Sequence, residues 1–317
     1  MKRIENPSVS VVIPAYNVAP YIVETLDAVF AQTFIDFEVI VINDGSLDTD
    51  ELERALAPYL DRVCYVRQEN SGAAAARNRG VQQAQGEYIA FLDGDDVWKA
   101  DYLESQLRFM RSGDYDLVYA DALLFGDSPV AGKTYMETTP SVGPVTFLSL
   151  VRNESHVITS GVVVKRAALM EAGLFDESLR NAQDFELWAR LARRGARLAY
   201  QRKVLLRYRC RKDSLSGNVM NRLAREIRVY RYIADTYDLT PAERTEISRV
   251  MELQLGAIDL ASGKVYLLGN KFDEARSSFE RAHDVLGGWK LGMAVLMLRV
   301  APRLLRRLAL SRLITAT

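Results

Sequence analysis

Short apolar runs alternate with amphipathic segments along the first hundred residues of the chain. Four runs have the length and composition of buried strands, at 9–13, 39–42, 63–66 and 88–92. Three segments between them carry apolar residues at helical spacing or are rich in alanine, at 21–32, 52–60 and 73–84. Strands that alternate with helices predict βαβ units, and hence an α/β fold whose mostly parallel sheet is flanked by helices on both sides.

Beyond residue 99 the alternation is less regular. Residues 126–144 predict a loop rich in Gly, Pro and Ser, and further strands are predicted at 162–164 and 204–208. Strand patterns end near residue 215, and helical patterns follow. We therefore predict a boundary near Gly217 and three parts: 1–100, 101–216 and an α-helical C-terminal region at 217–317.

The composition excludes several classes of protein. Lys plus Arg and Asp plus Glu both number 41 among the 317 residues, so the net charge is zero and we expect no nucleic-acid partner. The two cysteines, Cys64 and Cys210, are too few for a disulfide scaffold or a Cys-rich zinc site. The first residues do not resemble a signal peptide, and no run is apolar enough to span a membrane, so we expect a cytoplasmic protein.

Polar turns follow three of the predicted strands, at Pro14–Asn17, Asp44–Ser46 and Asp93–Asp96. Because the carboxyl ends of parallel strands meet at one edge of a sheet, we expect these turns to converge although they are far apart in sequence. The like charges of the Asp-rich turn repel one another, and a bound Mg²⁺ or Mn²⁺ ion would relieve that repulsion. The alternative is a solvated turn that caps the next helix.

Four segments, taken together and in this order, resemble the family 2 inverting glycosyltransferases: VSVVIPAYN, NDGS, NSGAAAARNRG and YIAFLDGDD. The similarity covers roughly residues 8–210. It implies a GT-A fold with a Rossmann-like sheet, in which 1–100 form the nucleotide-sugar-binding half and 101–216 the acceptor-binding half. It also implies a metal-dependent enzyme that transfers one sugar, with inversion, from a nucleoside diphosphate sugar to an acceptor.

The resemblance implies a set of nucleotide-binding positions: Pro14, Tyr16, Asn17, Asp44, Gly72, Arg77 and Asp93. Asp44 would accept hydrogen bonds from the base or the ribose, and Arg77 would donate a charge-assisted hydrogen bond to the nucleotide. The alternative for Tyr16 is a place in the core. Asp44 would otherwise stabilise its own turn, and Arg77 would otherwise pair with Glu69.

The resemblance also implies the metal ligand and the catalytic base. Asp95 would coordinate Mn²⁺ or Mg²⁺, and Asp93 would face the ribose or the metal. Asp184, at a predicted helix start, would remove the proton of the acceptor hydroxyl. Many relatives have Glu where this chain has Gln183, and the alternative for Asp184 is an ordinary helix-start residue. Glu186 is a rival base, but it would point about 200° away around the helix axis.

Five further residues match family positions near the acceptor or the diphosphate: Ser160, Gly161, Asp176, Arg209 and Arg211. Many relatives have a histidine at the position of Arg211, and in some that histidine is thought to help bind the metal. A guanidinium cannot ligate a metal ion, so two interpretations of Arg211 stay open: it contacts the phosphates, or it is merely exposed. Ser214 and Ser216 would belong to the same closing loop.

The C-terminal segment 285–317 has no Asp or Glu and six basic residues: Lys290, Arg299, Arg303, Arg306, Arg307 and Arg312. Apolar residues between them, and Trp289 before them, are typical of a segment that lies on an anionic membrane. One expectation is therefore peripheral contact with the inner face of the cell membrane, and the alternative is a terminal helix packed on the domain. Pro302 predicts a kink in this helix.

The resulting expectation is transfer of a sugar from a UDP-sugar to a glycan or lipid-linked acceptor in polysaccharide or cell-envelope biosynthesis. The sequence lacks the Gln-x-x-Arg-Trp signature of processive synthases, so we expect one sugar per encounter. A sugar nucleotidyltransferase would need a Gly-rich loop where this chain has Pro14–Asn17. The remaining alternative is a non-catalytic nucleotide-sugar-binding or interaction protein with a degenerate transferase fold.

Overall fold

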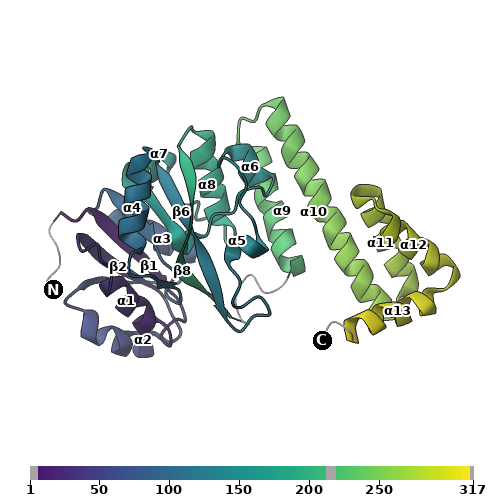
Figure 1. Ribbon diagram of the computed structural model, residues 1–317, viewed down its shortest axis with the longest axis horizontal. Helices are drawn as coiled ribbons and strands as arrows, with labels where there is room; N and C mark the ends of the chain where they lie inside the picture. The colour runs from purple at the N-terminus through teal and green to yellow at the C-terminus, as the bar shows by residue number, and fades with distance from the viewer. Residues whose placement is uncertain (1–5, 212–218, 315–317) are drawn as a thin grey trace. The chain divides into compact units, whose positions relative to one another are not determined.

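The computed structural model describes residues 6–211 and 219–314, apart from the side chains of 219–222 and 310–314. The chain divides into two compact units, Met1–Ser214 and Leu215–Thr317 (Figure 1). The predicted boundary near Gly217, together with Ser214 and Ser216, lies outside the described residues.

The N-terminal unit is built on one sheet, whose strands are β1 Val9–Ala15, β2 Phe37–Asp44, β3 Val63–Gln68, β4 Tyr88–Phe91, β5 Val97–Trp98, β6 Leu117–Gly126, β7 Val162–Lys165 and β8 Leu198–Cys210. Their order across the sheet is β3-β2-β1-β4-β7-β6-β8-β5. The first four neighbours in this order are parallel, β7 runs antiparallel to both its neighbours, β6 and β8 are parallel, and β5 is antiparallel to β8. The predicted α/β fold with a mostly parallel sheet is therefore confirmed, and antiparallel β7 separates its two parallel parts.

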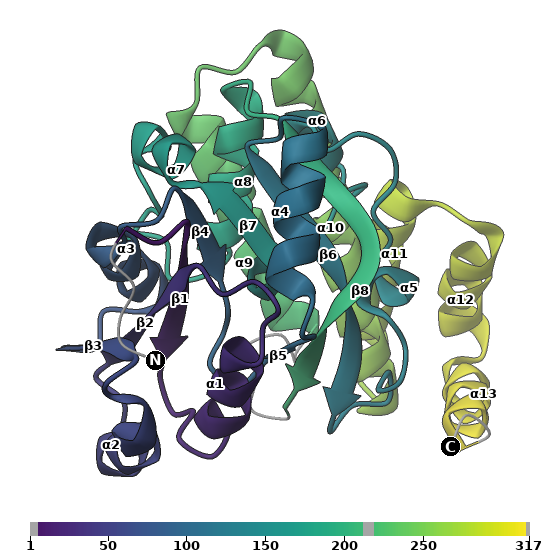
Figure 2. The same ribbon diagram turned by 60° about the vertical axis from the view of Figure 1, so that its left-hand side comes forward.

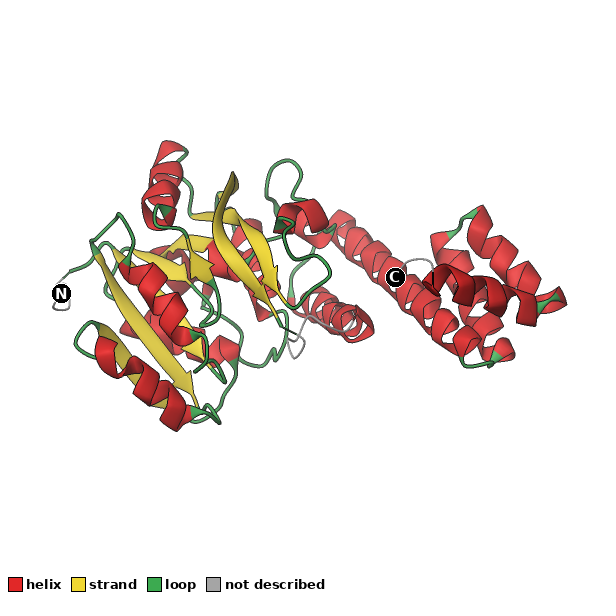
Figure 3. Ribbon diagram, turned by 60° about the horizontal axis from the view of Figure 1, so that its bottom comes forward, coloured by secondary structure: helices red, strands yellow, loops and turns green. Residues whose placement is uncertain are grey.

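Helices cover both faces of this sheet (Figures 2 and 3). The longer ones are α1 Ile22–Phe30, α2 Thr49–Leu56, α3 Ala73–Gln83, α4 Tyr102–Ser112, α7 Arg166–Ala172 and α8 Gln183–Arg193. Short helical turns also occur, at α5 Tyr135–Thr138, α6 Phe147–Val151, η1 Ala57–Tyr59 and η2 Thr159–Gly161. Successive side chains of a strand point to opposite faces. Accordingly, Val11 of β1 belongs to the same buried cluster as Leu26 of α1 and Leu107 of α4, whereas Val12 lies against α3.

The packing of α3 on the sheet depends on a glycine. A Cβ atom added to Gly80 would lie 2.3 Å from Cγ1 of Val12, closer than two carbon atoms can approach. The helix therefore lies nearer to β1 than any side chain at this position would allow. This close contact sets the distance between α3 and β1.

We expect Gly80→Ala to lower the free energy of unfolding by about 1–3 kcal/mol, the usual cost of overpacking a core. Thermal or urea unfolding measures the loss. Gly269→Ala is the matched control, because its Cβ would meet no atom nearer than 3.4 Å. Equal stability of the two variants would show that α3 can shift without cost.

In its described residues the C-terminal unit is helical: α9 Val219–Thr236, α10 Pro241–Leu268, α11 Phe272–Leu286, α12 Trp289–Val300 and α13 Pro302–Ile314. At the start of α10 Thr240 and Glu243 form a capping box, which satisfies otherwise unpaired backbone N–H groups. Gly263 of α10 allows close approach of α11, since an added Cβ would lie 2.4 Å from the ring of Phe279. A small core joins α10 to α12, formed by Leu267, Ala275, Phe279 and Leu298.

The prediction of one helix kinked at Pro302 is wrong. The structure has two separate helices, one ending at Val300 and the next beginning at Pro302. Ala301 between them has φ −149° and ψ 60°, which is not helical. The ring of a proline disfavours helical backbone at the residue before it, while the proline itself fits the first position of a new helix. In the described part of the chain, no helix is long and apolar enough to cross a membrane.

Candidate active site

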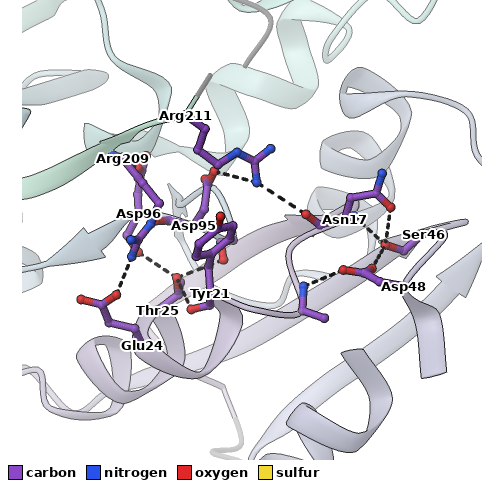
Figure 4. Close-up of polar contacts among 12 residues, drawn as sticks. Asn17, Tyr21, Glu24, Thr25, Ser46, Asp48, Asp95, Asp96, Arg209 and Arg211 are labelled. Carbon is purple, nitrogen blue, oxygen red and sulfur yellow. Dashed lines mark hydrogen bonds and ion pairs between the residues drawn. The ribbon is translucent and has the colours of Figure 1, made fainter. Parts of the chain in front are cut away.

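The turns that follow β1, β2 and β4 lie together, as the sequence predicted: hydrogen bonds join the first two, and Arg211 connects the first to the third (Figure 4). The backbone N–H of Asn17 donates to Ser46 Oγ over 2.6 Å, and Asn17 Oδ1 accepts from the N–H of Leu47 over 3.0 Å. Asn17 has a φ of 54°, in the left-handed region that Asn tolerates better than most residues. Tyr16 beside it is 44% exposed, so the alternative of a core position for Tyr16 is wrong.

The Asp-rich turn after β4 is held from below by α1. The buried hydroxyl of Thr25 lies 3.1 Å from the carbonyl oxygen of Gly94 and 2.9 Å from that of Asp96. Asp96 itself is 1% exposed, and its Oδ1 accepts from the N–H of Arg209 in β8 over 2.7 Å. Burial, and then the charges of Asp95 and Asp93, raise the pKa of Asp96 well above its ordinary value. Asp96 therefore links the turn to β8.

Asp95 faces the space above this turn. Its side chain is 18% exposed, and burial followed by the charge of Asp93 raises its pKa to about 6, although Arg211 and Arg209 oppose the shift. A carboxylate that burial and a like charge destabilise is suited to bind a cation. Among the described residues no three Asp, Glu, His or Cys side chains are placed to hold a metal by themselves. A metal at Asp95 would therefore need oxygen ligands from the substrate, as Mg²⁺ and Mn²⁺ commonly have.

Asp93 is paired with a buried arginine. Arg77, whose side chain is 6% exposed, places Nη2 2.7 Å from Asp93 Oδ1. Burial lowers the pKa of Arg77, but Asp93 and then Asp184 raise it more, so the net shift is upward. The alternative pairing of Arg77 with Glu69 is thus not observed. The buried guanidinium instead lies between the Asp-rich turn and the start of α8.

Asp44 organises the loop that leads into α3. Its Oδ1 accepts from Gln68 Nε2 over 2.8 Å and from the N–H of Ser71 over 2.9 Å, and its Oδ2 accepts from the N–H of Gly72 over 2.8 Å. Gly72 has a φ of 92°, a conformation that favours glycine, and space is open where its Cβ would be. Asp44 therefore stabilises the adjoining Ser71–Gly72 turn rather than its own.

Asp184 lies in the first turn of α8, as predicted. Its Oδ2 accepts from the hydroxyl of Thr159 over 2.9 Å, and its Oδ1 accepts from the N–H of Phe185 over 2.9 Å. Ser160, which follows Thr159 in the chain, is 1% exposed, and its Oγ accepts from the N–H of Asp93 over 3.1 Å. The dipeptide Thr159–Ser160 therefore connects the predicted base with the predicted donor site.

Thr159 is a site residue that the sequence analysis missed. It directly precedes the predicted pair Ser160 and Gly161, and that position was the signal that could have identified it. Buried side chains fix this turn from below: Trp98 Nε1 donates to the carbonyl of Ser160 and Gln106 Nε2 to that of Gly161, each over 2.8 Å.

Two other acidic residues have structural partners. Glu186, the rival base, is 1% exposed and forms a 2.8 Å ion pair with Arg190 one turn along the same helix. Asp176 Oδ1 accepts from the N–H of Ser178 within its own turn over 2.9 Å. Neither contact brings these carboxylates to Asp93 or Asp95.

The end of β8 brings two arginines to the Asp-rich turn (Figure 4). Arg209 Nε donates to the carbonyl of Asp95 over 2.8 Å, and its Nη2 pairs with Glu24 of α1. Arg211 Nη1 lies 3.4 Å from Asp95 Oδ2 and 3.5 Å from the carbonyl oxygen of Asn17. Arg211 is 19% exposed at its side chain, so the alternative that it is merely exposed is wrong.

Comparison with known proteins agrees with this arrangement. The sequence profile described as glycosyl transferase family 2 matches residues 10–173. The putative teichuronic acid biosynthesis glycosyltransferase TuaG of Bacillus subtilis is 31% identical over 72% of this chain and 88% of its own length. A glycosyltransferase of Rickettsia felis is 30% identical over 68% of this chain, but this match spans only 36% of that protein.

Solved structures show the same fold at low sequence identity. Staphylococcus aureus TarS 1–349, in complex with UDP-GlcNAc, superposes with a TM-score of 0.62 at 19% identity, over 98% of this chain and 92% of TarS 1–349. The mannosyltransferase PcManGT of Pyrobaculum calidifontis, in complex with GDP-Man and Mn²⁺, gives 0.64 at 18% identity over 96% of this chain and 84% of its own. With its GT-A fold and the profile match over half its length, the chain belongs to glycosyltransferase family 2.

Proposed function

We propose that the protein is an inverting glycosyltransferase that moves one sugar from a UDP-sugar to a glycan or lipid-linked acceptor, in polysaccharide or cell-envelope biosynthesis. The observation that carries the proposal is the link from Asp184 through Thr159 and Ser160 to Asp93, which joins a base to a donor site. The name of TuaG refers to teichuronic acid synthesis, and TarS was solved with UDP and with UDP-GlcNAc, which supports the choice of donor and acceptor class.

In this proposal residues 1–100 bind the nucleotide, with Pro14, Tyr16 and Asn17 at the nucleoside and Asp44 and Gly72 at the base or ribose. Asp95, with Asp93 beside it, would hold Mn²⁺ or Mg²⁺, and PcManGT was solved with Mn²⁺. The ion would supply positive charge to the departing diphosphate. The side chain of Arg77 is already paired with Asp93, so we propose that it orients that carboxylate instead of binding the nucleotide directly.

Residues 101–216 would bind the acceptor next to Ser160 and Gly161. Asp184 takes the proton of the acceptor hydroxyl, whose oxygen attacks C1 of the sugar as the bond from C1 to the diphosphate breaks on the opposite face. Inversion at C1 follows from this single displacement. Thr159 holds one oxygen of Asp184 and the N–H of Phe185 the other, so the carboxylate enters the reaction already oriented.

A panel of nucleotides tests the donor proposal. Saturation with a ligand at about 100 times its Kd stabilises a protein by about 2.7 kcal/mol, which thermal unfolding detects easily. We expect UDP with Mn²⁺ to raise Tm more than GDP or dTDP does, and UDP-sugars to be turned over to UDP when acceptor is present. If UDP raises Tm but no UDP-sugar is turned over with acceptor, or if no nucleotide changes Tm at all, the non-catalytic alternative is the better description.

Arg211 would contact the diphosphate from the position that it occupies beside Asp95. Hydrogen bonds to charged groups contribute about 1.5–3 kcal/mol, so we expect Arg211→Ala to weaken UDP binding in Mn²⁺ by about 10- to 100-fold. Calorimetry measures the change, and Arg211→Lys should recover part of it because the charge returns without the planar fork. The control is Arg108→Ala, an exposed arginine paired with Glu104. Undiminished affinity in Arg211→Ala would remove Arg211 from the donor site.

A further inference from the structure

We propose that the last two helices dock on an anionic lipid surface through their exposed apolar and basic side chains, here called the α12–α13 face. Its exposed apolar members are Trp289, Met293, Leu296, Val300, Leu304 and Leu308. This inference adds a location to the proposed transferase, and it stands on observations in the C-terminal unit alone.

The apolar residues of α12 form one stripe. At about 100° per residue, positions 289, 293, 296 and 300 fall within an arc of about 60°. Trp289 and Val300 at the ends of the stripe are 75% and 76% exposed, and Met293 and Leu296 between them are 49% and 52% exposed.

The opposite side of α12 is already used for packing. Leu298 is 5% exposed in the small core with Phe279 of α11, and Leu291 and Val295 pack against the same core. The outer stripe is apolar as well, but within the described residues of the C-terminal unit its side chains stay exposed. A contiguous exposed apolar patch of this kind marks a site of interaction with another apolar surface.

Charge indicates which surface this is. Viewed down the axis of α12, Lys290 and Arg299 lie on either side of the stripe, about 100° and about 80° from Trp289. On α13 Arg303 and Arg307 are exposed beside Leu304, in the same turns of the helix. Segment 285–317 contains no acidic residue, and Arg299 pairs with Glu280 of α11 over 2.7 Å.

This combination fits anionic lipid better than a second copy of the chain. Two α12–α13 faces in contact would bring like charges together, which is destabilising, whereas phosphate headgroups would neutralise them. Helices with this pattern lie in the plane of the membrane interface with the apolar side toward the acyl chains, and tryptophan is favoured at that depth. Docking there would allow a lipid-linked acceptor to reach the enzyme without leaving the bilayer.

Sedimentation of the full chain with vesicles tests the proposal. We expect binding to phosphatidylcholine vesicles that contain phosphatidylglycerol, weaker binding at high salt, and at least about tenfold weaker binding to phosphatidylcholine alone. The combined variant Trp289→Ala, Met293→Ser, Leu296→Ser should reduce binding by at least about tenfold. Arg303→Glu with Arg307→Glu should do the same for anionic vesicles only.

Control variants carry changes of the same kind at exposed positions outside the α12–α13 face. Val265→Ser removes an apolar residue of α10 that is 61% exposed, and Lys133→Glu with Arg202→Glu changes the net charge equally at exposed positions of the N-terminal unit. All variants should keep the wild-type Tm and UDP affinity, which separates this proposal from the donor proposal. The proposal of lipid docking would be overturned if all variants bound vesicles equally. It would also be overturned if the wild type bound no vesicles but formed a dimer that the apolar variant dissociates.

Discussion

Asp184→Asn is expected to reduce sugar transfer by about 100- to 10,000-fold, the range that a positioned general base contributes. Asparagine keeps the shape of the side chain and can still accept the hydrogen bond from Thr159, but it cannot take the acceptor proton. UDP affinity should stay at the wild-type value, because the role proposed for Asp184 is on the acceptor side of the reaction. Initial rates of UDP release with acceptor, together with calorimetry of UDP, measure both quantities.

Two further variants make this result specific. Thr159→Val leaves Asp184 in place without its hydroxyl partner, so we expect a smaller loss, seen mainly in kcat with little change in KM. Asp101→Asn is the control, since Asp101 is an exposed residue at the start of α4 whose side chain makes no cap hydrogen bond. Transfer at the wild-type rate by Asp184→Asn would exclude Asp184 as the base.

Asp95→Ala is expected to weaken Mn²⁺-dependent binding of UDP by at least about 100-fold, since even the loss of outer-sphere partners of a metal costs about 10- to 100-fold. Binding of UDP without metal should change little. Because burial and Asp93 raise the pKa of Asp95 to about 6, protons should compete with the metal, and Mn²⁺-dependent affinity should fall as the pH decreases through 6. Calorimetry of UDP with and without Mn²⁺, repeated at several pH values, measures these effects.

Asp96→Asn distinguishes the contribution of Asp95 to metal-dependent affinity from that of the neighbouring Asp96. Burial and the charges of Asp95 and Asp93 raise the pKa of Asp96, so its charged form is disfavoured, and an amide can keep the hydrogen bond from the N–H of Arg209. We therefore expect Asp96→Asn to retain most of the Mn²⁺-dependent affinity. A loss in Asp96→Asn that equals the loss in Asp95→Ala, or unchanged affinity in Asp95→Ala, would contradict the assignment of the metal to Asp95.

Local sequence patterns were sufficient to predict the parallel strands β1 to β4 and the convergence of the polar turns. Hydrophobic alternation identified β1, β2, β3 and β4, and the rule that parallel strands end at one edge placed Asn17 beside Ser46, where the structure has them hydrogen-bonded. Antiparallel β7 carries the same apolar pattern as a parallel strand, so its direction was not predictable from periodicity.

Contacts between side chains from distant segments were the part that sequence could not supply. Arg77 pairs with Asp93, and Arg211 lies against Asp95 across more than a hundred residues of chain, although nothing in the local spacing specifies either pair. Thr159 was missed because a hydroxyl next to a buried strand is common in sequence, and only the position of α8 gives it a carboxylate partner. The predicted loop 126–144 similarly contains α5, whose first turn is stabilised by a Thr134 capping box.

The most direct test of the donor site is a crystal structure with UDP and Mn²⁺, using the anomalous signal of manganese to locate the ion. We expect one manganese peak at coordination distance from the Asp95 carboxylate, with diphosphate oxygens among its ligands, and Asp184 facing the side where the sugar would be attached. A manganese peak away from the turn after β4, or UDP bound at another edge of the sheet, would contradict the proposed donor site.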